Sequence, residues 1–320
     1  MSVSKRIGLI EVGSNTIRYL AASFGNDIDF IPDKIETIKH NMHPSNPEEF
    51  AVREVNKVVE GFAEDAKQRR LDAVLIYGTA ACRKVSAQLP GKLSPLIKVL
   101  TPAEEAMASW VAGFACTSRA PGTRCTVIDE GSGSTEIVSA TWTGDAIQDL
   151  AFYSADVGST LLLEEYKADA KGHHALTTQK LREMVHALRE AGVASEHSGP
   201  LYLVGGVATS IGWLVSKKSG MQDYRPAEIN GAVLTLTELD KLYNGLDRLF
   251  KRDPAAAQRA VDTRRGSEDH VLRVISSLPY LTLLSSFLQP TGTYFVSGYG
   301  VRHGMGFLIR NELISLQRHS

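Results

Sequence analysis

The sequence predicts an α/β protein built of two similar halves. Residues 7–27 and 127–145 share one layout, which is an apolar run that ends in a carboxylate, a turn of Gly, Ser or Asn, and a second apolar run. In both halves strands come first, and helices then alternate with strands, as in α/β folds. The chain has 320 residues, which is long for a single hydrophobic core, so two domains are expected.

The first half contains one long amphipathic helix at about 48–70, because apolar residues recur there at every third or fourth position. A second helix begins at Thr101, where Thr101 and Glu104 form a capping box and Pro102 suits the first helical position. Strands are expected at about 6–12, 17–24, 28–31, 35–39, 73–77 and 97–100, with a further helix from 78 and the helix from 101 ending near 117.

The second half begins after residues 118–124, a linker that contains Pro and Gly. The domains are therefore placed at 1–123 and 124–300, and residues 251–266 are expected to be a mobile charged loop. Strands are expected at 125–129, 135–141, 146–152, 201–204 and 293–296, and helices at 160–169, 178–191, after Gly206, at 237–250, at 268–288 and from 301. Gly192 suits the residue after the helix at 178–191.

Composition is that of an ordinary soluble protein, with 43% hydrophobic and 22% charged residues. The net charge of −1 gives no general attraction to nucleic acid or to an anionic membrane. Residues 271–288 are the most apolar stretch, but they include Arg273, Pro279 and several serines, which indicates a buried helix. The three cysteines have no metal-ligand spacing and indicate a reducing compartment, so a cytoplasmic protein is expected.

The two carboxylate-and-turn segments predict a site for phosphate and Mg²⁺. Small residues let backbone N–H groups converge on an anion, and Mg²⁺ prefers oxygen ligands. Glu11 and Asp129 are the expected metal ligands, holding Mg²⁺ through water. The expected phosphate-binding residues of the two turns are Gly13, Ser14, Asn15, Gly131, Ser132, Gly133 and Ser134. Plain hairpin turns would also use Gly and Ser, but they would not explain a carboxylate at the strand end in both copies.

Five segments in order make the chain resemble the exopolyphosphatase/guanosine pentaphosphate phosphohydrolase (Ppx/GppA) family. The family's Asp-x-Gly-Ser-Asn-Ser looks like EVGSNT at 11–16, and its Asp-x-Gly-Gly-Gly-Ser-Thr-Glu looks like DEGSGSTE at 129–136. The other three are GTAACRK at 78–84, TPAEEA at 101–106, and Gly205-Gly206 with SGYGVRHG at 297–304. The resemblance covers nearly the whole chain.

This resemblance implies an actin-like ATPase (ribonuclease H-like) fold, with two similar lobes and the active site in the cleft between them. The helix at 301–320 is then expected to pack on the first lobe. The implied reaction is Mg²⁺-dependent hydrolysis of a terminal phosphoanhydride, with inorganic polyphosphate as the first substrate and guanosine penta- or tetraphosphate as the second. Glu105 matches the family's carboxylate that positions the attacking water, and Glu11 and Asp129 complete the catalytic set. Glu104 is expected only to cap its helix.

Three arginines and one Gly-Gly pair extend the expected phosphate-binding set. Arg18 and Arg83 each follow a small-residue turn, from which a bidentate guanidinium can reach back to a phosphate. Arg302 belongs to the C-terminal motif, and Gly205-Gly206 can receive a phosphate at a helix N-terminus. His173, His174 and His186 lack a matching ligand cluster, so an exposed loop and an exposed helix face are expected for them.

Four positions depart from the family pattern. Glu11 stands for Asp, Ser132 for the middle Gly, Val207 for Thr and Leu161 for Arg. These departures keep two alternatives open, which are a sensor that binds polyphosphate or an alarmone without hydrolysing it and a polyphosphate:nucleotide phosphotransferase. No nucleic-acid or membrane partner is expected, and a homodimer stays open.

Overall fold

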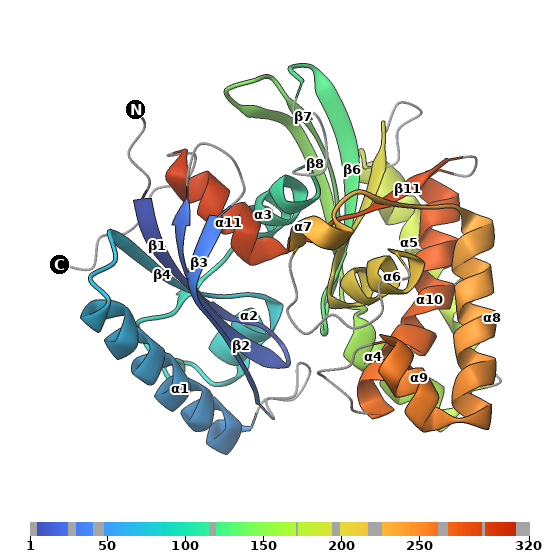
Figure 1. The fold of residues 1–320 in the computed structure, drawn as a ribbon, viewed down its shortest axis with the longest axis horizontal. Helices are drawn as coiled ribbons and strands as arrows, with labels where there is room; N and C mark the ends of the chain where they lie inside the picture. The colour runs from blue at the N-terminus through green and yellow to red at the C-terminus, as the bar shows by residue number, and fades with distance from the viewer. Residues whose placement is uncertain are drawn as a thin grey trace. The chain divides into compact units, whose positions relative to one another are not determined.

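The computed structural model describes residues 5–24, 30–40, 48–114, 120–170, 172–193, 199–216, 226–261, 268–289 and 292–311. These residues form two compact units, and Figure 1 shows that each consists of a sheet with helices packed on it. Unit 1 comprises Met1–Val111 and Val301–Ser320, and unit 2 comprises Ala112–Gly300. The chain passes from unit 1 to unit 2 within helix α3 (Pro102–Phe114), ahead of the expected linker at 118–124, part of which lies outside the described residues.

The sheet of unit 1 has the strand order β3-β2-β1-β4-β5. Its first three strands form an antiparallel meander, and β4 and β5 add in parallel beside β1. Parallel neighbours need a crossover, which helices supply. The strands are β1 (Lys5–Val12), β2 (Thr16–Phe24), β3 (Phe30–Lys39), β4 (Ala73–Gly78) and β5 (Lys98–Val99).

Two helices cover opposite faces of this sheet. Helix α1 (Glu49–Gln68) buries its apolar stripe against the face that carries Ile10, Ile17 and Tyr19, and the Tyr19 ring lies 5.1 Å from that of Phe62. Side chains alternate along a strand, so Glu11 and Arg18 point to the other face. Helix α11 (Val301–Arg310) packs there against β1 and β2. The remaining crossover helix is α2 (Ala80–Gln88).

The sheet of unit 2 repeats this plan with the order β10-β11-β9-β6-β7-β8. Strands β6, β7 and β8 form the antiparallel meander, while β9 and then β11 add in parallel beside β6. The strands are β6 (Thr123–Glu130), β7 (Thr135–Trp142), β8 (Ile147–Ala155), β9 (Leu201–Gly205), β10 (Ala232–Leu234) and β11 (Tyr294–Val296). Two sheets that each combine a meander with parallel strands confirm the predicted α/β class.

Helix α10 (Glu268–Leu288) is the central helix of unit 2, and α4, α5, α6, α8 and α9 pack against it. Its apolar residues lie in the main core cluster together with Ile128, Ile137 and Leu203 of the sheet. The surrounding helices are α4 (Ser159–Ala168), α5 (His173–Glu190), α6 (Gly206–Ser216), α7 (Pro226–Ile229), α8 (Leu236–Arg252) and α9 (Pro254–Val261).

Several sequence predictions need correction. Helix α9 occupies half of the segment 251–266 that was predicted as a mobile loop, because Ala257 and Val261 supply an apolar face that packs on the core, and residues 262–266 lie outside the described residues. The predicted strands at 28–31 and 35–39 are one strand as far as it is described. Helix α5 begins five positions earlier than predicted, at His173. Helix α7 and strand β10 were missed, because four and three residues are too few to show a repeating apolar pattern.

Other predictions of local structure are confirmed. The capping box at the start of α3 is present, because Thr101 Oγ1 accepts from the Glu104 N–H at 3.2 Å and Glu104 Oε2 accepts from the Thr101 N–H at 2.9 Å. Gly192 follows α5 with a φ of 71°. Cys82 and Cys125 are buried free thiols, whereas Cys116 lies outside the described residues. Of the described helices, only α10 is long and apolar enough to cross a membrane, and 72% of that stretch is buried.

Candidate functional site

The two predicted hairpins have the same register. In unit 1 Glu11 pairs with Arg18 across β1 and β2, and in unit 2 Asp129 pairs with Glu136 across β6 and β7. Each turn is closed by the same kind of bond, from the Gly13 N–H to the Thr16 carbonyl at 3.0 Å and from the Gly131 N–H to the Ser134 carbonyl at 2.9 Å. The internal repeat read from the sequence is therefore a repeat of backbone geometry.

In unit 1 the Glu11 carboxylate lies between two guanidinium groups. Arg18 Nη1 lies 3.5 Å from Glu11 Oε1, and Arg302 Nε lies 3.4 Å from Glu11 Oε2. Arg18 arrives from the neighbouring strand, and Arg302 from the first turn of α11. All three side chains are largely buried. The structure thus brings together three residues that the sequence analysis placed in the site, with two arginines facing one carboxylate.

Tyr77 joins this group and was missed by the sequence analysis. It is the β4 partner of Glu11, so both side chains point to the same face of the sheet. The Tyr77 side chain is fully buried, and its hydroxyl has no hydrogen-bond partner among the described residues. Burial, and then the nearby Glu11 carboxylate, raise the pKa of this hydroxyl well above its ordinary value. The signal in the sequence was weak, because a tyrosine at the end of a strand is ordinary core.

Glu105 and Arg83 form the second group of unit 1. Arg83 Nη1 donates to Glu105 Oε2 at 2.6 Å and to the Leu100 carbonyl at 3.1 Å. Glu105 lies in the first turn of α3 and is only 5% exposed. Its neighbour Glu104 has the other role expected of it, since it caps α3 and pairs with Lys98 at 2.7 Å. Arg83, predicted as a phosphate ligand, is in this structure the partner of the predicted catalytic carboxylate.

The first turn, residues 13–15, is held from outside by His40, another residue missed in the sequence. His40 Nε2 donates to the Gly13 carbonyl at 2.9 Å, and the His40 N–H donates to the Asn15 carbonyl at 3.2 Å. Burial lowers the pKa of the His40 imidazole, opposed by its bond to Gly13. The imidazole is therefore a structural donor that fixes the turn next to Ser14.

In unit 2 the strand pair carries two carboxylates where unit 1 has a carboxylate and an arginine. Asp129 and Glu136 are direct cross-strand partners, and residues opposite each other in an antiparallel pair have Cβ atoms about 4.5–5.5 Å apart. Both are at least 95% buried. Ser154, the next residue in the same row on β8, donates to Glu136 Oε1 at 3.0 Å. The row presents carboxylate oxygens on one face of the sheet.

The second turn, residues 131–134, rests on the N-terminus of α4. The Ser159 N–H donates to the Gly131 carbonyl at 3.0 Å, and the Thr160 N–H donates to the Ser132 carbonyl at 2.9 Å. Gly158 has to be glycine here, because a Cβ would lie 2.6 Å from the Ser132 carbonyl group. Arg273 from α10 holds this helix start through Thr160 Oγ1 at 2.5 Å. From the sequence, this segment was predicted as a helix at 160–169 in which Leu161 replaces the Arg of the family pattern, and its contact with the turn was not predicted.

Glu130 points to the opposite face from Asp129, into the core against α10. Its Oε1 accepts from Ser277 Oγ at 2.5 Å, while Oε2 has no hydrogen-bond partner among the described residues. Burial in apolar surroundings raises the pKa of Glu130 to about 8, with the hydrogen bond from Ser277 acting in the other direction. No sequence signal singled it out, since the strand alternation that turns it inward depends on the register of β6.

Gly205 and Gly206 have different roles. Gly205 has a φ of 103°, and a Cβ there would lie 2.5 Å from the Glu130 carbonyl oxygen and 3.0 Å from Asp129 Oδ1. A side chain at this position would therefore press on the carboxylate row. Gly206 begins α6, and a Cβ there would meet nothing within 4 Å. Strand β9 thus ends at Gly205 beside Asp129, and the missing side chain leaves space next to the Asp129 carboxylate.

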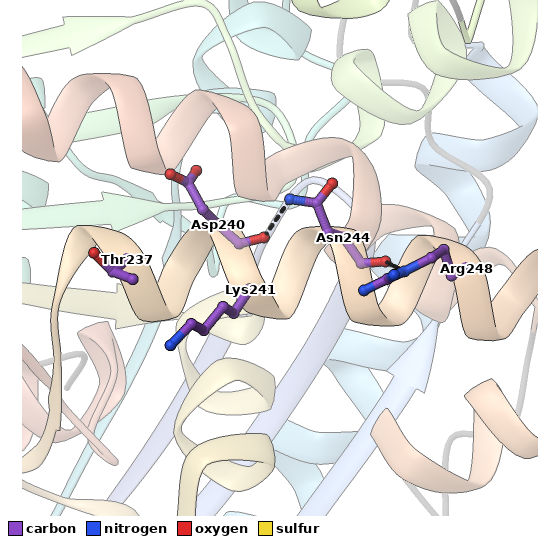
Figure 2. Close-up of a pocket in the computed structure, with 5 residues that line it drawn as sticks. All are labelled: Thr237, Asp240, Lys241, Asn244 and Arg248. Atoms are coloured by element: carbon purple, nitrogen blue, oxygen red, sulfur yellow. Dashed lines mark hydrogen bonds between the residues drawn. The ribbon is translucent and has the colours of Figure 1, made fainter.

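Two other features of unit 2 are separate from these groups. His173, expected on an exposed loop, is instead buried in α5, where Nε2 donates to the Ser276 carbonyl at 2.8 Å, whereas His186 is 82% exposed as predicted. A surface hollow of about 550 Å³ follows one face of α8 (Figure 2). Asn244 and Arg248 on it donate to carbonyls of their own helix, at 2.8 and 2.9 Å. The hollow is lined by no predicted site residue, and we interpret it as a solvated face of α8.

The residues of unit 2 fit a divalent cation better than Glu11 does. Mg²⁺ is usually held by one or two carboxylates together with waters and substrate phosphates, and Asp129 with Glu136 supplies two carboxylates in one row. The Glu11 carboxylate already faces two guanidiniums, which would repel a further cation. Among the described residues, no group of three or more His, Cys, Asp or Glu side chains is placed to hold a metal ion.

Comparisons with solved structures agree with this architecture. The chain is similar to the Aquifex aeolicus PPX-GPPA enzyme, with 19% identity and a TM-score of 0.67 over 95% of this chain and 99% of that one. It is also similar to an exopolyphosphatase from Cytophaga hutchinsonii, with 16% identity and a TM-score of 0.71 over 96% and 98%. At such identities the likeness concerns the fold, and it confirms the predicted actin-like ATPase fold.

No curated protein matches the chain. The model of the Ppx/GppA phosphatase family matches residues 40–307, which is well over half of the chain and includes Arg83, Glu105, the second turn and the Gly-Gly pair. The family supports phosphatase-type hydrolysis as the general activity. On this match, the chain belongs to the Ppx/GppA phosphatase family.

Proposed function

We propose that this protein is a Mg²⁺-dependent phosphoanhydride hydrolase that releases the terminal phosphate of inorganic polyphosphate. The observation that carries the proposal is the Asp129–Glu136 row, which lies directly beside a turn of small residues and a strand end kept free of a side chain at Gly205. Carboxylates next to the backbone N–H groups of a small-residue turn suit a metal–phosphate complex, since one part binds the cation and the other the anion. The same features serve guanosine pentaphosphate, which is the second candidate substrate.

Unit 2 has the parts that would hold the phosphates. The Gly131 N–H closes the turn, so the N–H groups of residues 132–134 would donate to phosphate oxygens, with the hydroxyls of Ser132 and Ser134 as further donors. Asp129 and Glu136 would hold the Mg²⁺ ion, which when bound neutralises phosphate charge. The turn is held rigidly by Thr160 and Gly158 beneath it. A preorganised turn loses little freedom on binding, which favours affinity for the phosphate group.

Unit 1 has the general base. Glu105 is kept as an oriented carboxylate by Arg83, so it can accept a proton from an attacking water. A general base within reach of the reacting water contributes on the order of 10²–10⁴-fold in rate. Phosphoryl transfer has a loose transition state and depends largely on positioning and on neutralised charge. Arg18 and Arg302 are the cations of unit 1 that fit that second requirement.

A phosphate-release assay with polyphosphate and Mg²⁺ tests the proposal. Wild-type protein is expected to release phosphate, and Glu105→Gln to reduce kcat by on the order of 10²–10⁴-fold. Glu104→Gln is the matched control, because this neighbouring glutamate caps α3 and pairs with Lys98 instead. The control should retain kcat within about twofold, because Glu104 bonds to Thr101 and Lys98 and not to Arg83.

Three results would overturn the proposal. No phosphate from either polyphosphate or guanosine pentaphosphate, together with ligand-induced thermal stabilisation, would favour a binding sensor. Transfer of the phosphoryl group to a nucleoside diphosphate, instead of to water, would favour a phosphotransferase. Equal rates for Glu105→Gln and Glu104→Gln would remove Glu105 from the mechanism.

A further inference from the structure

The surroundings of Glu11 contain more hydrogen-bond donors than they satisfy. Glu11 faces Arg18 at 3.5 Å and Arg302 at 3.4 Å, both longer than the 2.7–2.9 Å typical of a charge-assisted hydrogen bond. Arg18 Nε is buried and has no hydrogen-bond partner among the described residues, and the same is true of the Tyr77 hydroxyl. Buried donors left without partners cost free energy, so native structures seldom keep them unless a ligand or water uses them.

The charged groups around these donors indicate what kind of ligand would use them. Two guanidiniums flank the Glu11 carboxylate in a largely buried place. Both unused groups can donate a hydrogen bond. A group that accepts hydrogen bonds and carries negative charge is therefore favoured, and a divalent cation is disfavoured.

The sheet register aims Tyr77 at this place. Arg18, Glu11 and Tyr77 are consecutive partners across β2, β1 and β4, so their side chains form one row on one face. Besides burial, the charged groups that act on the pKa of the Tyr77 hydroxyl are Glu11, Arg302, Arg18 and Glu105. The equivalent row of unit 2 has Val204 in place of Tyr77. The hydroxyl is thus a feature of unit 1 alone.

We propose that Tyr77, Arg18 and Arg302 form an oxyanion site for a phosphate group, in which Glu11 holds the two arginines and does not bind metal. This deepens the proposed function and rests on it, because the phosphate group would belong to the same class of substrate. Tyr77 is the additional binding residue. Its hydroxyl would donate a hydrogen bond to a phosphate oxygen.

Calorimetric titration of the full chain with tripolyphosphate in EDTA tests this site without turnover or metal. Tyr77→Phe removes only the hydroxyl. It should leave the melting temperature of the ligand-free protein unchanged or higher, because no protein hydrogen bond is lost, and it should weaken tripolyphosphate binding by about tenfold or more. Tyr19→Phe is the matched control, since Tyr19 is equally buried in the same sheet but faces α1. It should bind as wild type does.

A second variant tests whether the loss of affinity in Tyr77→Phe is indirect. Arg18→Gln should weaken tripolyphosphate binding at least as much as Tyr77→Phe. Unchanged affinity in Tyr77→Phe, equal loss in Tyr19→Phe, or no binding by wild-type protein in EDTA would each overturn the site. Phosphate release by wild type with unchanged Tyr77→Phe affinity would overturn this site alone. The expected pattern of affinities without any phosphate release would overturn the hydrolase proposal alone.

Discussion

Arg83 donates to Glu105 Oε2 at 2.6 Å and, through the same Nη1, to the Leu100 carbonyl at 3.1 Å. The carboxylate is therefore fixed by a group that is itself fixed to the backbone. An arginine in this position orients the Glu105 carboxylate. An arginine that bound the substrate would not hold this carboxylate in place. The two roles predict different kinetics.

Arg83→Lys is expected to lower kcat by about 10- to 100-fold and to leave KM for polyphosphate within a few fold. A lysine cannot reproduce the planar fork of arginine, so the carboxylate would lose its orientation and substrate binding would be little affected. Steady-state kinetics of phosphate release give both constants. A large rise in KM with unchanged kcat would show that Arg83 binds phosphate directly.

Gly205→Ala should destabilise the protein, and Gly206→Ala should not. The φ of 103° alone makes a side chain at 205 cost about 1–2 kcal/mol, and contact with the Glu130 carbonyl adds to this. At 206 an added methyl group meets nothing and favours the helix. Thermal melts compare the two, with a loss of at least about 2–4 °C expected for the first alone. Equal melting temperatures would contradict the assigned backbone at Gly205.

Glu130 predicts a specific pH dependence of stability. Its pKa rises from the ordinary 4.5 to about 8 in the folded protein, so between these values the folded state binds more protons than the unfolded state. Stability from this group is complete below about pH 4.5 and is lost as the pH rises toward 8. The slope reaches up to about 1.4 kcal/mol per pH unit.

Glu130→Gln should remove that slope. Urea unfolding of metal-free protein from pH 5 to about pH 9 measures it, and the variant should gain stability relative to wild type as pH rises. Glu64→Gln serves as control, because it makes the same chemical change at an exposed position. If the free energies of unfolding of wild type and Glu130→Gln differ by the same amount across this range, burial does not keep Glu130 protonated.

Removal of Mg²⁺ with EDTA is expected to abolish phosphate release, and Mg²⁺ to restore it. Glu136→Gln should raise the Mg²⁺ concentration for half-activation by about tenfold or more, since one of two carboxylates in the row is lost. Glu11→Gln should leave that concentration within about threefold, because its carboxylate faces arginines. The reverse ranking would place the metal in unit 1 and contradict both assignments.

Much of the site could be predicted from local sequence. The turns at 13–15 and 131–134, the capping box at Thr101 and the strand ends at Glu11 and Asp129 depend on residues close together in the chain. Their roles follow from turn chemistry and capping, which act over a few positions. Tyr77, His40 and Glu130 could not be predicted in this way. Each acquires its role from a neighbour far away in sequence, namely Glu11, Gly13 and Ser277.

The sequence by itself determined the repeated plan of the two halves, the carboxylate that ends each first strand and the small residues of each turn. Only the tertiary structure decided what each carboxylate faces. Cross-strand register places Arg18 opposite Glu11 and Glu136 opposite Asp129, and α11 brings Arg302 to the first of these pairs. The physical reason is that the charge around a side chain is set by neighbours on adjacent strands and helices, which no local pattern contains. Two equivalent motifs thereby acquired different cross-strand partners, an arginine in unit 1 and a second carboxylate in unit 2.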